Sequence, residues 1–313
     1  MENNFSLKFI ENLPTFYLKL TKKYSNRLIF GSNRSIFKGS GVEFVDVREY
    51  IPGDDPRYID WNVSARYNQL FVRNFQEERE IPVFVCIDLS STLFFGTKNK
   101  LKIELLIEIV AFIINLAHSL NERLGAFVSF KKEFSYFKPS KNLANNYKIL
   151  HFLNNIYKDF FKNKEKYLGA SNNILNLISK INQFLKRTSI LFFVSDFVDI
   201  DDFEIPKISL LFNYFVKKGN ELFLIKIGDP AEFDLPIVGT VTLLDPITKK
   251  AKTFNLSNEK IRELFKQKIT NKYNSIKNIA LKNNSLYISY LTNENLESKI
   301  KEFIMKNRYK NKK

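Results

Sequence analysis

The feature that most constrains this chain is a set of short, mainly apolar runs, each about as long as one buried strand. These runs lie at residues 83–87, 126–130, 189–194 and 221–227. Longer stretches with helical periodicity alternate with them, at residues 101–120, 142–162, 173–186 and 202–217. Near-continuous apolar runs are typical of strands that are buried on both faces of a parallel sheet. The alternation therefore predicts an α/β fold: a doubly wound, mostly parallel sheet flanked by helices and joined by right-handed crossovers.

The segments on either side of this alternation carry weaker patterns. Before it, a helix, an alternating strand, a turn, a short helical stretch and a strand are predicted at residues 5–23, 39–50, 51–56, 57–66 and 70–75. After it, a strand, a helix, a strand and a helix are predicted at residues 240–244, 258–274, 285–290 and 294–305. We therefore expect an N-terminal helix with a β-rich subdomain at 1–80, an α/β domain with a C-terminal extension at 81–305, and a basic tail at 306–313.

Charge is distributed unevenly along the 313 residues, whose formal net charge is +16. Residues 39–97 contain no Lys, five Arg and ten acidic residues, so this segment carries 5 − 10 = −5 and the remainder carries 16 + 5 = +21. An A+T-rich coding sequence favours Lys codons, and this bias could account for part of the excess positive charge. The single Cys excludes a disulfide framework within the chain, and with only two His a conventional zinc site is not expected.

Targeting and membrane signals are not evident in the sequence. The first twelve residues include charged side chains and no apolar core of a signal peptide. The longest apolar stretch, at 109–120, contains Asn115, His118 and Ser119, and it is shorter than the roughly 20 residues that span a bilayer. We therefore expect a cytoplasmic protein with no transmembrane segment.

Two predicted strands end in side chains that carry oxygen. The first is followed by Asp88, Ser90 and Thr92, and another ends at Asp196. Ligands of open α/β sheets bind beyond the carboxyl ends of the strands, and Mg²⁺ prefers oxygen ligands, so these residues could share a Mg²⁺ ion. The alternative is structural: Asp88 and Ser90 would cap the helix that begins near residue 99 and bond loop amides.

The Asp-x-Ser-x-Thr sequence at one strand end, with Ser-Asp at another, resembles the metal-ion-dependent adhesion site of von Willebrand factor A domains. In that family a Thr from a Gly-rich loop completes the site, and here the matching loop offers Ser171 or Asn172. Thr92 stands where the family usually has a second Ser. The resemblance implies a Mg²⁺ cofactor whose coordination is completed by a carboxylate of a protein partner.

A longer ordered block lies upstream. It consists of Glu43, Asp46, Arg48, Glu49, Tyr50, Pro52, Gly53, Asp54, Asp55, Arg57, Asp60, Trp61, Arg66 and Arg73. With the glycines at 39 and 41 and with later segments at 228–236 and 244–246, this block resembles a bacterial family, domain of unknown function 58, over residues 25–305. Members carry a von Willebrand A-like domain, and many are thought to work with MoxR-type AAA+ ATPases. The resemblance implies a non-enzymatic adaptor with an ATPase of this class as its protein partner.

The absence of Lys from this block favours a fixed network of Arg–carboxylate pairs, because Arg binds a carboxylate through two parallel hydrogen bonds. The network could be a scaffold that holds the turn at 52–56, or it could be a partner-docking surface. We expect Gly53 to supply a turn position with positive φ. Trp61 is interpreted as a buried anchor held against the α/β domain, with a contact residue as the alternative. Cys86 is interpreted as a core residue, and His118 as a core histidine or one at a helix C-terminus.

Two other classes of function remain as alternatives. The positive charge outside the block would suit a nucleic-acid-binding protein, but no recognition motif is evident and the lysines are spread, so no nucleic-acid partner is expected. A metal-dependent hydrolase could use Asp88 and Asp196, yet the sequence shows no distinctive general base. Because P-loop, dinucleotide and serine-hydrolase motifs are all missing, we do not expect an enzyme.

Overall fold

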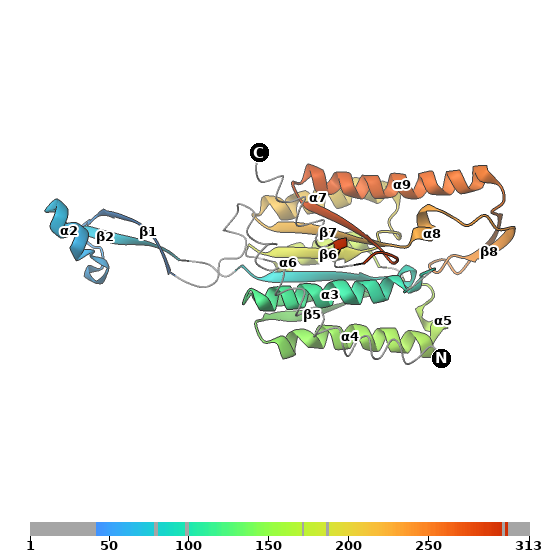
Figure 1. Ribbon diagram of the computed structural model, residues 1–313, viewed down its shortest axis with the longest axis horizontal. Coiled ribbons are helices and arrows are strands. Elements are labelled where there is room, and N and C mark those ends of the chain that lie inside the picture. Colours follow the sequence, from blue (N-terminus) through green and yellow to red (C-terminus); the bar gives the residue numbers. More distant parts are fainter. Residues whose placement is uncertain are drawn as a thin grey trace. The chain divides into compact units, whose positions relative to one another are not determined.

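The computed structural model describes residues 42–77, 81–97, 100–170, 172–185, 188–295 and 298–299 (Figure 1). The described residues fall into two compact units, one at 42–77 and one at 81–299. The helix predicted at 5–23, most of the helix predicted at 294–305 and the tail at 306–313 lie outside the described residues.

The larger unit is built on one six-stranded sheet. Its strands are β3 (Val83–Leu89), β4 (Leu124–Phe130), β5 (Glu133–Ser140), β6 (Ile190–Ser195), β7 (Glu221–Gly228) and β10 (Leu286–Leu291). The order across the sheet is β10-β7-β6-β3-β4-β5, and all neighbouring pairs are parallel except β4 with β5. The predicted mostly parallel sheet is therefore confirmed. The edge strand β5 was not predicted, because its half-exposed residues include Lys138 and Pro139 and lack a continuous apolar run.

Helices cover both faces of this sheet. The long helices are α3 (Lys102–Ser119), α4 (Leu143–Lys162), α6 (Ile174–Phe184), α7 (Ile205–Lys217) and α9 (Glu259–Lys282). Short helical segments are η2 (Ser91–Phe94), α5 (Lys164–Tyr167), η3 (Asp202–Glu204) and α8 (Pro230–Phe233). Figure 1 shows α3 and α4 on one face and α7 and α9 on the other, as predicted for a doubly wound sheet. Helix α9 is longer than predicted because Ile276, Ile279 and Ala280 extend its buried face.

The core on the α6, α7 and α9 side is rich in aromatic residues from the central strands. Phe84, Cys86 and Phe193 of β3 and β6 pack there against these helices. The rings of Phe84 and Phe127 stack with centroids 5.0 Å apart. The prediction for Cys86 is therefore confirmed. His118 is exposed near the end of α3, which supports the interpretation as a C-terminal histidine.

A separate hairpin follows α8. Its strands, β8 (Thr240–Leu244) and β9 (Ala251–Asn255), pair only with each other in antiparallel fashion within the described residues. The strand predicted at 240–244 is thus present, and its partner at 251–255 was missed. No helix in the part of the chain that the structure describes is both long enough and apolar enough to cross a membrane.

The smaller unit contains an antiparallel pair, β1 (Val42–Glu49) and β2 (Phe71–Glu77), joined through the 3-10 helix η1 (Pro56–Tyr58) and the helix α2 (Trp61–Tyr67). The predicted strand, turn, helical stretch and strand are all confirmed. Asp60 caps α2 by accepting hydrogen bonds from the amides of Asn62 and Val63. Gly53 has φ +113°, which confirms the predicted turn position.

Candidate functional site

The candidate site lies at the carboxyl ends of two neighbouring parallel strands, β3 and β6. From β3 the chain continues to β4 on one side, and from β6 it continues to β7 on the other, so the sheet order reverses between them. Such a switch point is where open α/β sheets usually bind ligands. Asp88 stands near the end of β3, Asp196 directly follows β6, and both are buried. The register that pairs Ile87 with Val194 brings these two carboxylates to the same edge.

Asp88 accepts hydrogen bonds at both carboxylate oxygens. The amide nitrogen of Asn172 lies 2.8 Å from Oδ1, and the hydroxyl of Ser195 lies 2.8 Å from Oδ2. The same Asn172 nitrogen lies 3.0 Å from the carbonyl of Ser129, while its Oδ1 accepts from the amide of Lys132. Asn172 therefore presents a donor to Asp88. Burial raises the pKa of Asp88 to about 6 against the opposing effect of these two hydrogen bonds.

Asp196 accepts two hydrogen bonds at one oxygen. The Thr92 hydroxyl donates to Oδ2 at 2.6 Å, and the ammonium group of Lys102 donates to the same atom at 2.7 Å. Ser90 lies 2.6 Å from the Thr92 hydroxyl oxygen. Because the Thr92 proton points to Asp196, Ser90 is the donor in this pair. The other carboxylate oxygen, Oδ1, accepts from the amide of Val198 at 3.3 Å.

Lys102 joins Asp196 to a third acidic residue, Glu232. Its ammonium nitrogen lies 2.6 Å from Glu232 Oε1, and the Lys102 side chain is only 1% exposed. Glu232 Oε2 accepts from the Tyr273 hydroxyl at 2.9 Å and from the Asp229 amide at 3.2 Å. Burial lowers the pKa of Lys102, but attraction to Asp196 and Glu232 outweighs burial and raises it above its usual value. Lys102 is therefore a charged ammonium group inside the protein.

Asp199 lies beside this cluster and is half-buried. Its Oδ2 atom is buried without a hydrogen-bond partner in the part of the chain that is described, and the Asn172 amide bonds the carboxylate. Burial, and then the charges of Asp88 and Asp196, raise the pKa of Asp199 to about 7. Asp88, Asp196 and Asp199 thus lie near one another at the end of the sheet, and Lys102 is the cation that contacts Asp196.

Most of the predicted metal ligands lie close together. Asp88 contacts Asn172 and Ser195. Thr92 contacts both Ser90 and Asp196. Ser171 lies outside the described residues. The capping alternative is wrong: at the start of α3 the Leu101 amide donates to Glu104, and Asp88 bonds side chains rather than loop amides. Of the groups that were predicted to coordinate a cation, the Thr92 hydroxyl and the Asn172 amide donate to carboxylates, and the Ser90 hydroxyl lies against that of Thr92.

Mg²⁺ does not fit this donor set as it stands. The ammonium group of Lys102 already lies 2.7 Å from Asp196 Oδ2, so a divalent ion bound at that carboxylate would meet a positive charge at close range. Across the described ranges, no group of three or more His, Cys, Asp or Glu side chains is placed to hold a metal ion. Mg²⁺ binding stays a prediction.

Lys102 and Glu232 were not identified as site residues from the sequence. Lys102 is a single Lys at the start of the apolar stretch that forms α3, and Glu232 belongs to the later family-like segment at 228–236. The available signal for Lys102 was its place as the one Lys of a mainly apolar helix whose acidic residues are Glu104 and Glu108. For Glu232 the signal was its position three residues after Asp229, which together form a capping box on α8.

The Arg-rich block forms three Arg–carboxylate pairs within the smaller unit. Arg48 binds Asp54 through two hydrogen bonds of 2.7 and 2.6 Å. Arg57 pairs with Asp55 at 2.7 Å, and Arg73 pairs with Asp60 at 2.9 Å. Asp54 also accepts from the Ile51 amide, so the first pair closes the turn that contains Gly53. Part of the predicted Arg–carboxylate network is therefore present, as separate pairs among the described side chains, and the Glu43 side chain lies outside the description.

Trp61 is 66% exposed, so the smaller unit by itself does not bury the indole, and its role as an anchor against the α/β domain stays a prediction. It is the first residue of a two-turn helix, and Ser64 is the buried residue of that helix. A strand pair with one short helix offers no second layer against which the indole could be buried. The exposed large apolar side chains of this unit are Ile51, Tyr58, Trp61, Tyr67 and Leu70.

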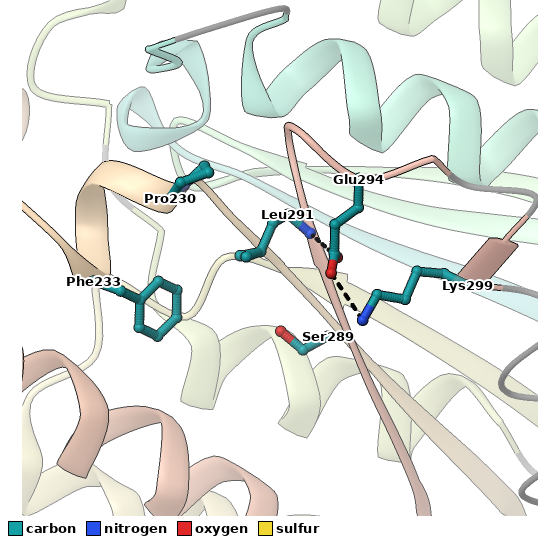
Figure 2. A pocket seen from close by; sticks show the side chains of 6 residues that line it. All are labelled: Pro230, Phe233, Ser289, Leu291, Glu294 and Lys299. Carbon is teal, nitrogen blue, oxygen red and sulfur yellow. Dashed lines mark hydrogen bonds and ion pairs between the residues drawn. The ribbon is translucent and has the colours of Figure 1, made fainter.

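A pocket of about 370 Å³ opens near the carboxyl ends of β7 and β10 (Figure 2). Its lining residues are Pro230, Phe233, Ser289, Leu291, Glu294 and Lys299. Figure 2 shows Glu294 between the Leu291 amide and the Lys299 ammonium, which lie 2.9 and 2.8 Å from its carboxylate oxygens. The acidic group of this pocket is therefore already neutralised.

The fold and the site together define an α/β protein with a buried polar cluster at the switch point of a mostly parallel sheet. Residues 46–275 match the family described as Protein of unknown function DUF58, and the chain belongs to this family. Similar proteins include Uncharacterized protein Mb1516 of Mycobacterium bovis and Uncharacterized protein Rv1480 of Mycobacterium tuberculosis H37Rv. Each is 25% identical over 249 residues, which are 80% of this chain and 74% of the relative.

Two solved structures show limited likeness to this chain. The conserved hypothetical protein BatB of Bacteroides thetaiotaomicron has 13% identity and a TM-score of 0.46, and the match covers 73% of this chain and 99% of that one. An aerotolerance-related membrane protein of Bacteroides fragilis has 12% identity and a TM-score of 0.44, with 72% and 99% covered.

Proposed function

We propose that this chain is a non-enzymatic, cytoplasmic adaptor that binds a MoxR-type AAA+ ATPase through the exposed apolar side chains of its smaller unit. The larger unit would be a von Willebrand A-like domain. The partner class follows from the resemblance of the sequence to domain of unknown function 58, and the docking surface follows from the exposure of Trp61.

The observation that carries this proposal is the exposed indole of Trp61 at the start of a helix that is held by hydrogen bonds. Trp and Tyr are the residues that most often dominate binding energy at protein interfaces. Here Asp60, which precedes Trp61, caps α2 and binds Arg73, so the start of the helix is held in place. Val72 is the buried hydrophobic residue among the described side chains of this unit. So small an apolar core leaves exposed apolar surface for a partner to cover.

An adaptor is favoured over a hydrolase because the two central carboxylates are used structurally. A general base needs a lone pair directed at a substrate proton. Asp88 accepts from Asn172 and Ser195, and Asp196 accepts from Thr92 and Lys102. All of these side chains except that of Asn172 are buried.

The test is a binding titration with the purified MoxR-type ATPase encoded in the same genome. Trp61→Ala should weaken binding at least about tenfold, as expected for an interface hot spot. Phe203→Ala is the matched control, because Phe203 is 70% exposed and lies in the larger unit. This control should bind like wild type, and circular dichroism should show that both variants are folded.

Other outcomes would change the conclusion. If Asp88→Asn abolishes binding while Trp61→Ala does not, the partner docks at the end of the sheet. If wild type binds no ATPase of this class, the adaptor proposal is wrong.

A further inference from the structure

We propose that this protein carries its own cation at the switch point: the ammonium group of Lys102 takes the place of a divalent metal ion, and the site functions without Mg²⁺. The inference concerns the larger unit alone and does not depend on which partner the chain binds.

The first support is charge pairing. The Lys102 nitrogen lies 2.7 Å from Asp196 Oδ2 and 2.6 Å from Glu232 Oε1, so one cation bridges two carboxylates. The side chains of Lys102 and Asp196 are almost completely buried. A buried charge is tolerated when it is paired and hydrogen-bonded, as it is here. A divalent ion at Asp196 would face this ammonium group at close range, where two positive charges repel strongly in a low-dielectric interior.

The second support is the direction of the hydrogen bonds. A metal site presents oxygen lone pairs to its centre, whereas the Asn172 amide presents its N–H protons to Asp88. Thr92 donates to Asp196, and Asn172 points its amide nitrogen at Asp88. Asn172 is fixed in this orientation because its nitrogen also faces the carbonyls of Leu89 and Ser129. Rotating the amide to offer oxygen to a cation would place that oxygen against three acceptor oxygens.

The third support is the place of Lys102 in its helix. It is the first residue of α3, where the helix dipole disfavours a positive side chain. Nothing in the local sequence favours a buried Lys there, so the tertiary pairing with Asp196 and Glu232 must supply the stabilisation. Both acids come from other segments, 94 and 130 residues further along the chain. The ammonium group is therefore held in place by two carboxylates that the fold brings together.

The experiment begins with wild-type protein, titrated with MgCl₂ in a calorimeter and melted in EDTA and in Mg²⁺. We expect no binding heat and the same Tm in both buffers. A Mg²⁺-binding heat that disappears in Asp88→Asn or Asp196→Asn would overturn the inference, whatever the variants of Lys102 do.

Variants test the role of the ammonium group directly. Lys102→Met keeps the apolar chain and removes the charge, leaving two buried carboxylates unpaired, so Tm should fall by about 10 °C. Lys166→Met is the matched control: Lys166 makes an ion pair of 2.6 Å with Asp159 but is exposed to solvent, and a shift of at most a few degrees is expected.

A triple variant keeps the test decisive if Lys102→Met does not fold. Lys102→Met combined with Asp196→Asn and Glu232→Gln removes all three charges, and it should recover a large part of the lost Tm. If Lys102→Met melts like wild type, or if the triple variant is less stable than Lys102→Met, the ammonium group is not the cation of this site.

Discussion

The ammonium nitrogen of Lys226 lies 3.5 Å from the centre of the Tyr273 ring and 4.4 Å from that of Phe233. It has no hydrogen-bond partner within the described ranges, and the Lys226 side chain is fully buried in β7. Aromatic faces attract a cation but do not replace its hydration shell completely. Burial therefore lowers the pKa of Lys226 to about 8, with Glu232 opposing this shift.

This pKa predicts how stability depends on pH. An unfolded Lys has a pKa near 10.4. Between pH 8 and pH 10.4 the unfolded chain binds more protons than the folded one, so the contribution of Lys226 to stability rises with pH across this window. The full rise is about 3 kcal/mol. Lys226→Met should therefore be more stable than wild type at pH 7, with the difference shrinking by pH 10 in urea unfolding curves.

The control for this prediction is Lys218→Met. Lys218 also lies over an aromatic ring, at 4.5 Å from the centre of Tyr214, but it is exposed. Its removal should change stability by less than about 0.5 kcal/mol at either pH. A Lys226→Met protein that is less stable than wild type at pH 7 would mean that the ring contacts outweigh the cost of burial.

Gly53→Ala should destabilise the smaller unit. Gly53 has φ +113°, and no atom lies within 4 Å of the position that a Cβ would take, so the cost comes from backbone strain alone. That strain is about 1–2 kcal/mol for an L-residue. Gly239→Ala is the control, because its Cβ also meets nothing within 4 Å and its φ is not in the strained region. Hydrogen exchange at β1 and β2 should accelerate only in Gly53→Ala.

Arg48→Lys should open the turn at residues 51–54 without unfolding the larger unit. Arg48 binds both oxygens of Asp54, and a single ammonium group cannot reproduce that geometry. The measurement is the exchange rate of the Ile51 amide, which donates to Asp54. Asp54 has its pKa lowered to about 2 by Arg48, so in wild type this protection should persist below pH 4 and disappear as the pH falls through 2. Unchanged exchange in Arg48→Lys would contradict a role for the paired hydrogen bonds.

Asp229→Ala should be strongly destabilising, because this buried carboxylate gathers donors from three segments. It accepts from the hydroxyl and amide of Thr97, from the hydroxyl of Thr292 and from the amide of Ala231. Removing this carboxylate leaves several hydrogen-bond donors without an acceptor, so the free energy of unfolding should fall by about 3 kcal/mol. Asp245→Ala is the control: Asp245 makes similar turn bonds to Thr248 but is exposed to solvent, and about 1 kcal/mol is expected. If chemical denaturation shows the same loss of unfolding free energy for both variants, the carboxylate of Asp229 is no more important to stability than an exposed turn residue.

Cys86 should report unfolding of the larger unit. It is the one cysteine in the sequence, it is fully buried in β3, and burial raises its thiol pKa. Reagents attack the thiolate, so labelling of native protein should be slower than labelling in urea by orders of magnitude. Rapid labelling of the native protein would mean that β3 is accessible without unfolding.

The sequence predicted the order of most strands and helices in the larger unit because a strand buried on both faces is apolar at nearly every position. Strands β3 and β6 are apolar at nearly every position, and α3 is apolar around most of its circumference. Strand β5 has no such pattern, because an edge strand is only half-buried and tolerates Lys138 and Pro139. The strand ends also predicted the right neighbourhood for the site, since parallel strands bring Asp88 and Asp196 to one edge.

By itself, the sequence determined the alternating α/β architecture, the position of the polar cluster and the Arg–carboxylate pairs of the turn, which join residues close together in the chain. Only the tertiary structure decided what those polar groups do. Lys102 meets Asp196 and Glu232 across 94 and 130 residues, and no local pattern encodes such a meeting. The exposure of Trp61 was decided in the same way, because whether an indole is buried depends on the layers that pack around it. Charge and apolarity are properties of a residue, whereas pairing and burial are properties of its surroundings.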